Sequence, residues 1–132
     1  MTYDLEEDIN HIKEGLNKDG FFLLSGYLAN SQEIIDIKNK IYELVCIKAT
    51  QSNIPIPKNS EASINETIIS LYNINKSIGG FLNDTLNSSP ELFRLLNSDY
   101  FIELAKKIIG DETCSILINN HRIRVQIPGT DD

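Results

Sequence analysis

Two arginines and a glutamine alternate with aliphatic residues near the end of the 132-residue sequence. Arg122, Arg124 and Gln126 follow one another at two-residue steps. In a strand this spacing places the three polar side chains on one face. Because guanidinium groups bind carboxylates through paired hydrogen bonds, this face could receive a carboxylate-bearing ligand. The same side chains could instead pair with acidic residues of the protein or face solvent.

Other patterns of catalytic residues are missing from the sequence. Neither His11 nor His121 has an acidic residue two positions later, so neither begins an H-x-D iron-binding pair. His11 lies off the apolar side of its predicted helix and is expected at the surface. No G-x-S-x-G or C-x-x-C motif is present, and Gly79-Gly80 lacks the Lys-Ser/Thr of a phosphate-binding loop. The sequence therefore names no catalytic residue and no metal ligand.

The charge and the cysteines exclude several classes of function. With 19 acidic against 12 basic residues the net charge is −7, which argues against binding to nucleic acid or to an anionic membrane. Cys46 and Cys114 lie in apolar surroundings typical of reduced, buried thiols. Residues 1–8 hold four acids and do not have the pattern of a signal peptide. We therefore expect a cytoplasmic protein.

Apolar residues at three- and four-residue steps predict helices through most of the chain. A first helix runs from about residue 5 to Gly20, and a second is capped by Asn30 or Ser31. Two prolines make residues 51–60 an extended loop. Further helices are predicted over 64–86, with a break at Gly79-Gly80, then from the Ser89-Pro90 start, and over 100–109 with Asp99 as cap and Gly110 as stop.

Short apolar or alternating runs predict strands. They cover 21–24, 114–118 and 122–127. We therefore expect an α+β protein with a single domain over 1–132, in which 1–110 is mainly helical and 111–132 begins a sheet. A hairpin alone leaves its strand edges uncovered. The expected result is a homodimer or a domain-swapped sheet formed through the exposed strands of 113–127; in the alternative, the helices cover the hairpin.

Two stretches of the sequence resemble phytanoyl-CoA-dioxygenase-like proteins. Residues 12–28, with Asp19-Gly20-Phe21-Phe22 at their centre, are similar to a helix that leads into that family's first strand. Residues 95–110 are similar to its paired short helices ending in glycine. The run 114–129, which closes on Pro128-Gly129, is similar to the entry into the catalytic barrel.

The resemblance implies a fold and an activity. The family's core is a double-stranded β-helix (a jelly-roll, cupin-like barrel) that binds Fe(II) and 2-oxoglutarate. Its H-x-D pair follows the Pro-Gly segment, and the sequence holds no such pair after Gly129. The resemblance thus implies the amino-terminal segment of a dioxygenase that hydroxylates a small molecule, without cofactors of its own. In the longer parent enzyme, Arg122, Arg124 and Gln126 match a strand facing the ligand pocket.

A second interpretation needs no catalysis. The chain is then a small, acidic, helical interaction module. The two interpretations leave open whether the chain forms part of an enzyme, and the nucleotide sequence beyond codon 132 separates them. An open frame that reaches an H-x-D motif favours the oxygenase, and a stop codon favours the module.

Overall fold

The computed structural model describes residues 5–21, 31–110, 124 and 126, with side chains in the first helix described from Ile9 onward. All the regular structure in these residues is helical. The helices are α1 (Leu5–Asp19), α2 (Gln32–Gln51), α3 (Glu61–Ile74), α4 (Ile78–Asn87), α5 (Pro90–Leu96) and α6 (Asp99–Ile109).

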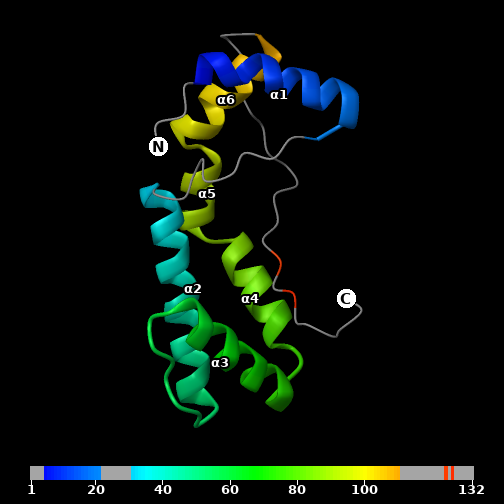
Figure 1. The fold of residues 1–132 in the computed structure, drawn as a ribbon. Helices are drawn as coiled ribbons and strands as arrows, with labels where there is room; N and C mark the ends of the chain where they lie inside the picture. Colours follow the sequence, from blue (N-terminus) through cyan, green and yellow to red (C-terminus); the bar gives the residue numbers. More distant parts are fainter. Residues whose placement is uncertain (1–4, 22–30, 111–123, 125, 127–132) are drawn as a thin grey trace.

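Helix α2 is the central element of the described fold. It packs against α3, α4 and α5, whereas α1 packs against α6 (Figure 1). Figure 1 shows α2, α3 and α4 together at one end of the molecule and the α1–α6 pair at the other, with α5 between them. Segments far apart in the sequence therefore meet at the α1–α6 end.

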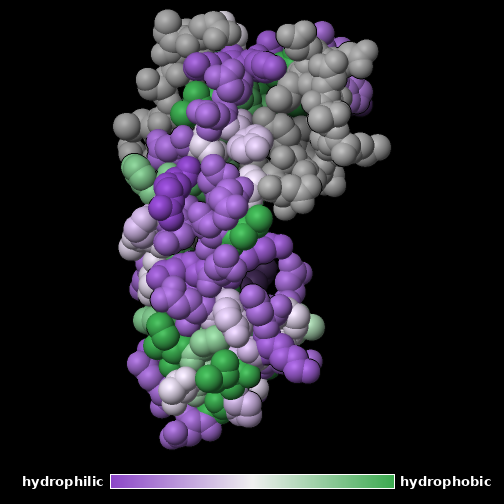
Figure 2. Space-filling view, turned by 90° about the vertical axis from the view of Figure 1, so that its left-hand side faces the viewer, coloured by the Kyte–Doolittle hydropathy of each residue, from purple (hydrophilic) through white to green (hydrophobic). Residues whose placement is uncertain are grey.

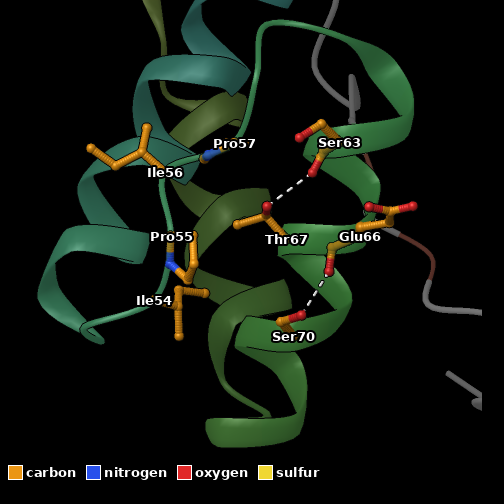
Figure 3. A pocket seen from close by; sticks show the side chains of 8 residues that line it. All are labelled: Ile54, Pro55, Ile56, Pro57, Ser63, Glu66, Thr67 and Ser70. Atoms are coloured by element: carbon orange, nitrogen blue, oxygen red, sulfur yellow. Dashed lines mark hydrogen bonds between the residues drawn. The ribbon is translucent and has the colours of Figure 1, made fainter.

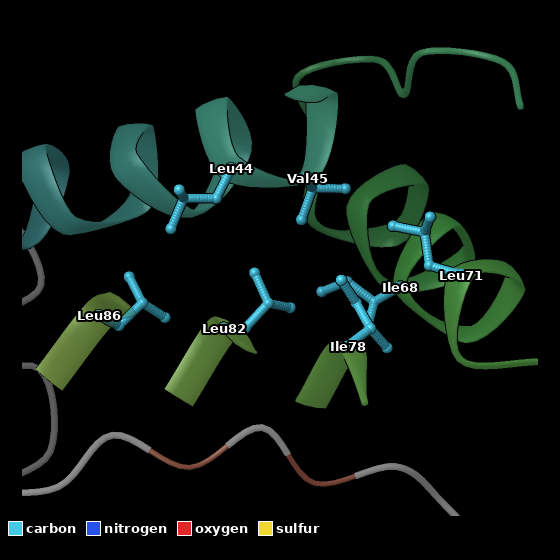
Figure 4. Close-up of a cluster of buried hydrophobic side chains, with 7 residues drawn as sticks. All are labelled: Leu44, Val45, Ile68, Leu71, Ile78, Leu82 and Leu86. Carbon is cyan, nitrogen blue, oxygen red and sulfur yellow. The ribbon is translucent and has the colours of Figure 1, made fainter. Parts of the chain in front are cut away.

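A cluster of aliphatic side chains fills the space between α2, α3 and α4 (Figure 4). Val45 of α2 and Leu82 of α4 are both 0% exposed. Burial of a side chain of this size contributes about 1.5–3 kcal/mol. The members of this main cluster are Leu44, Val45, Ile68, Leu71, Ile78, Leu82 and Leu86.

A smaller cluster joins α2 to α5. It contains Ile37, Leu92 and Leu95, and half-buried Phe101 of α6 packs against it. Half-buried Ile41 contacts both clusters. The apolar face of α2 is thus covered along its length by successive helices, as an amphipathic helix requires.

Serine side chains begin several helices, as the sequence predicts. Ser31 Oγ accepts a hydrogen bond from the backbone N–H of Ile34 at 3.3 Å, so Ser31 and not Asn30 is the N-cap of α2. Ser89 Oγ accepts from the N–H of Leu92 at 3.2 Å and starts α5 ahead of Pro90. Each bond satisfies a donor that the first turn leaves unpaired.

Two predicted helix boundaries are wrong. The break in the 64–86 stretch falls at Asn75–Ser77, where Asn75 Oδ1 accepts hydrogen bonds from Ser77 N at 3.0 Å and Ser77 Oγ at 2.8 Å. This side-chain turn competes with the helix, while Gly79-Gly80 lies inside the first turn of α4. At α6 the N-cap is Ser98, so Asp99 is the first helical residue and not the cap.

The predicted α+β fold is also wrong. Within residues 5–21, 31–110, 124 and 126 the structure has helices and no strand or sheet. Phe21, which we predicted in a buried strand, is outside any strand and 71% exposed. Arg124 and Gln126 are also in neither helix nor strand. Apolar runs alone predict a strand poorly, because a strand forms only where a partner supplies its hydrogen bonds.

Several sheet predictions fall outside the described residues. The run 114–118, most of 121–127 and the expected β-helix entry over 111–132 lie there. The same holds for residues 22–24 and for the homodimer predicted through 113–127. The dimer stays a prediction. The described part of residues 1–110 is mainly helical, with helix boundaries that differ from the predicted ones at the positions given above.

Candidate functional site

A cleft separates the extended segment 54–57 from α3 (Figure 3). Its volume is about 320 Å³. The extended segment gives it an apolar wall of isoleucines and prolines, and α3 gives it a polar wall. The lining residues are Ile54, Pro55, Ile56, Pro57, Ser63, Glu66, Thr67 and Ser70.

The extended segment is held in place at both ends. Asn53, which follows α2, has a left-handed backbone with φ 53°, a conformation that asparagine tolerates better than most residues. The N–H of Ile54 then bonds the carbonyl of Ala49 at 3.0 Å. Past the prolines, the N–H of Lys58 bonds Ser63 Oγ at 2.9 Å. The apolar wall is therefore tethered to α2 and to α3.

A tyrosine of α2 supports this wall from behind. The Tyr42 hydroxyl donates a hydrogen bond to the carbonyl of Pro57 at 3.3 Å. A hydrogen bond with Cys46, one turn along α2, raises the pKa of Tyr42 above its ordinary value, and desolvation adds to the rise. Tyr42 therefore keeps its proton to higher pH than a free tyrosine.

The polar wall consists of hydroxyl groups that already have partners. Thr67 Oγ1 donates to the Ser63 carbonyl at 2.9 Å, and Ser70 Oγ donates to the Glu66 carbonyl at 2.9 Å (Figure 3). Figure 3 shows the Glu66 carboxylate pointing away from the extended segment. These hydroxyls can accept hydrogen bonds from a ligand, but Thr67 and Ser70 donate their protons to backbone carbonyls and not to a carboxylate that would activate them as nucleophiles.

Sequence reasoning missed this cleft. Its hydroxyls recur at four- and three-residue steps, from Ser63 to Thr67 to Ser70, which is a signal of one helical face. The pairing of that face with residues 54–57 depends on how the chain returns from α2 to α3. The spacing of residues within one helix does not show which segment that helix face packs against.

A second cleft, of about 530 Å³, lies where α2 meets the start of α3. Ile41 and Ile64 give it an apolar floor. At its rim Lys38 Nζ forms an ion pair with Glu61 Oε1 at 3.0 Å. The pair is well exposed, and exposed pairs of this kind contribute less than about 1 kcal/mol. Its charges cancel, so the rim selects neither anions nor cations.

A third depression, of about 250 Å³, lies between α2 and α5 and is lined by charged groups. Lys40 pairs with Glu43 at 3.0 Å, and Arg94 pairs with Glu91 at 3.6 Å. Each cation is neutralised by an acid one turn away on its own helix. The depression therefore resembles a solvated helix surface more than an anion-binding site.

Two of the three sequence-predicted ligand residues, Arg124 and Gln126, lie in the described part of the chain. Arg122 is outside the described residues. Arg124 and Gln126 are exposed and do not line any of the three clefts. Their proposed contact with a carboxylate ligand stays a prediction.

The described residues do not fit an iron centre. No group of three or more His, Cys, Asp or Glu side chains in this part of the chain is arranged to hold a metal ion. His11 is exposed on α1, as predicted from the sequence, and His121 lies outside the described residues. Across the helices that the structure describes, none is long and apolar enough to cross a membrane.

Comparisons with protein-family models, with curated proteins and with solved structures found no match for this chain. Its function is therefore inferred from the residues themselves and from the arrangement of the helices.

Proposed function

We propose that this chain is the amino-terminal helical part of an Fe(II)- and 2-oxoglutarate-dependent dioxygenase of the phytanoyl-CoA dioxygenase type. In this proposal it is not catalytically competent alone, because its sequence supplies no H-x-D pair. Iron and 2-oxoglutarate bind to the longer parent enzyme, whose substrate is a small molecule. We also propose a cytoplasmic location, which the apolar sequence context of the two cysteines supports.

One observation carries the proposal. The two stretches that resemble the oxygenase family, 12–28 and 95–110, are more than sixty positions apart in the sequence. Their helices, α1 and α6, nevertheless pack against each other (Figure 1). Each helix is followed by a glycine with φ 77°, Gly20 after α1 and Gly110 after α6. Glycine stops of this kind end many helices, so the contact between α1 and α6 is the feature that supports a common structural role for the two stretches.

Within this proposal Arg124 and Gln126 meet the ligand only when the rest of the barrel is present. Both side chains are exposed in the described structure. An exposed guanidinium binds a carboxylate weakly, since water competes for it. A surrounding barrel lowers the local dielectric and strengthens the same contact. The isolated chain is therefore expected to bind 2-oxoglutarate only weakly.

The test begins with the gene. The reading frame is sequenced beyond codon 132, and the protein that it encodes is expressed with Fe(II), 2-oxoglutarate and ascorbate. The expected result is an H-x-D motif shortly after Gly129 and release of succinate from 2-oxoglutarate. The chain of 132 residues, assayed in parallel, is expected to release none. Tight iron binding by this short chain contradicts the proposed location of the ligands.

Matched arginine variants sharpen the test in the longer protein. Arg124→Gln removes a predicted ligand contact and is expected to raise the KM for 2-oxoglutarate or for the substrate at least about tenfold, the loss of a charge-assisted hydrogen bond. Arg94→Gln removes an arginine that forms an ion pair with Glu91 on its own helix, α5, so it serves as the control with an unchanged KM. Equal KM values for both variants contradict the role of Arg124.

A non-catalytic interaction module is the second candidate. Apolar side chains exposed at the α2–α3 end favour it. Ile56 is 61% exposed and Ile74 60%, and Figure 2 shows hydrophobic surface at that end of the molecule. Large apolar groups of this kind often mark protein contacts. A stop codon directly after codon 132, together with the absence of succinate formation, supports this candidate over the oxygenase.

A further inference from the structure

We draw no further inference here: the strongest candidate, the apolar edge of α6 around the 65%-exposed Ile109, carries nothing, because nothing in the structure shows what covers it and its order of acidic then basic residues is what the helix dipole favours in any helix.

Discussion

The two ends of the molecule bury their apolar residues to different degrees. At one end α2, α3 and α4 share seven buried aliphatic side chains, several of them with almost no exposure (Figure 4). At the other end α6 has a regular apolar face but no buried residue. Ile12 of α1 is 1% exposed, so α1 is anchored while α6 is only half-covered.

Apolar packing is complete in the α2–α4 core and only partial at α6. In the core, α2, α3 and α4 each pack against the other two helices, and their shared side chains are buried. Helix α6 has the sequence of a helix that buries one side, yet its side chains stay partly exposed. Under the proposed function the remainder of the oxygenase covers that side. Mutations at the two ends should therefore differ in their effect on the free energy of unfolding.

The largest expected effect is at the centre of the α2–α4 core. Leu82→Ala removes a side chain that is 0% exposed and is expected to lower the free energy of unfolding by about 2–5 kcal/mol. Ile109→Ala, the matched variant on α6, should cost less than about 0.5 kcal/mol because its side chain already faces solvent. Urea unfolding followed by circular dichroism measures both. A comparable loss for Ile109→Ala overturns the contrast between the two ends.

Helix caps offer a second comparison between the regions. Ser89 Oγ accepts from Leu92 N and donates to the Leu86 carbonyl at 2.7 Å, so Ser89→Ala is expected to cost about 1–2 kcal/mol. Ser98 at the start of α6 is buried, but within the described residues its hydroxyl has no partner. Ser98→Ala should leave stability unchanged or raise it slightly. Thermal unfolding of the two variants tests this order, and the reverse order contradicts it.

Two glycine-to-alanine substitutions should change the free energy of unfolding by about 1 kcal/mol each, in opposite directions. Gly110 ends α6 with φ 77°, so Gly110→Ala forces a side chain into the left-handed region and should cost about 1–2 kcal/mol. Gly80 lies in α4, and the position that an added methyl group would occupy has no neighbouring atom within 4 Å. Gly80→Ala should therefore stabilise the protein by about 0.5–1 kcal/mol. The midpoints of thermal unfolding should move in opposite directions, and a shared direction counts against this assignment of the backbone.

The smallest expected effect is a pH dependence beside the cleft. The pKa of Tyr42 is raised in the folded protein, first by the hydrogen bond with Cys46. The unfolded chain therefore loses this proton first, near pH 10. Above that pH the unfolded state binds fewer protons than the folded state, and stability falls as pH rises toward the folded pKa. Below about pH 10 the contribution of Tyr42 to stability is fully present.

Two variants test this loss of stability at alkaline pH. Tyr42→Phe removes the titrating group, so the part of the stability decrease due to Tyr42 should disappear. Cys46→Ala removes the main cause of the raised pKa and should make the decrease smaller. Stability against urea is measured across the alkaline range, and tyrosinate absorbance follows the titration. An identical pH profile in wild type and both variants rules out a role for this hydrogen bond.

Much of the helical structure could be predicted from local sequence. Ser31 and Ser89 cap their helices, and Gly20 and Gly110 take the left-handed backbone expected after a helix. These features depend on a few neighbouring residues, so a local pattern is sufficient. Where Asn75 offered a competing side-chain turn, the glycine pair was the more conspicuous signal and led to the wrong boundary.

The candidate site was harder to predict. Arg124 and Gln126 were chosen because a strand would align them, but the structure places neither in a strand. The cleft beside α3 is formed by residues 54–57, which the sequence marked only as an extended loop. Its geometry depends on bonds such as Tyr42 to Pro57, fifteen positions apart. No short sequence motif encodes a contact between residues so far apart in the chain.

The sequence by itself determined which stretches of residues 5–21 and 31–110 are helical, apart from the boundaries at Asn75–Ser77 and Ser98. Periodicity and capping act within one or two turns, so the information is local. Only the tertiary structure decided that α1 and α6 lie together and that α2 carries most of the core. It also decided that Phe21 stays exposed instead of entering a buried strand. Burial depends on which partner surface is available, and that is a property of the whole fold.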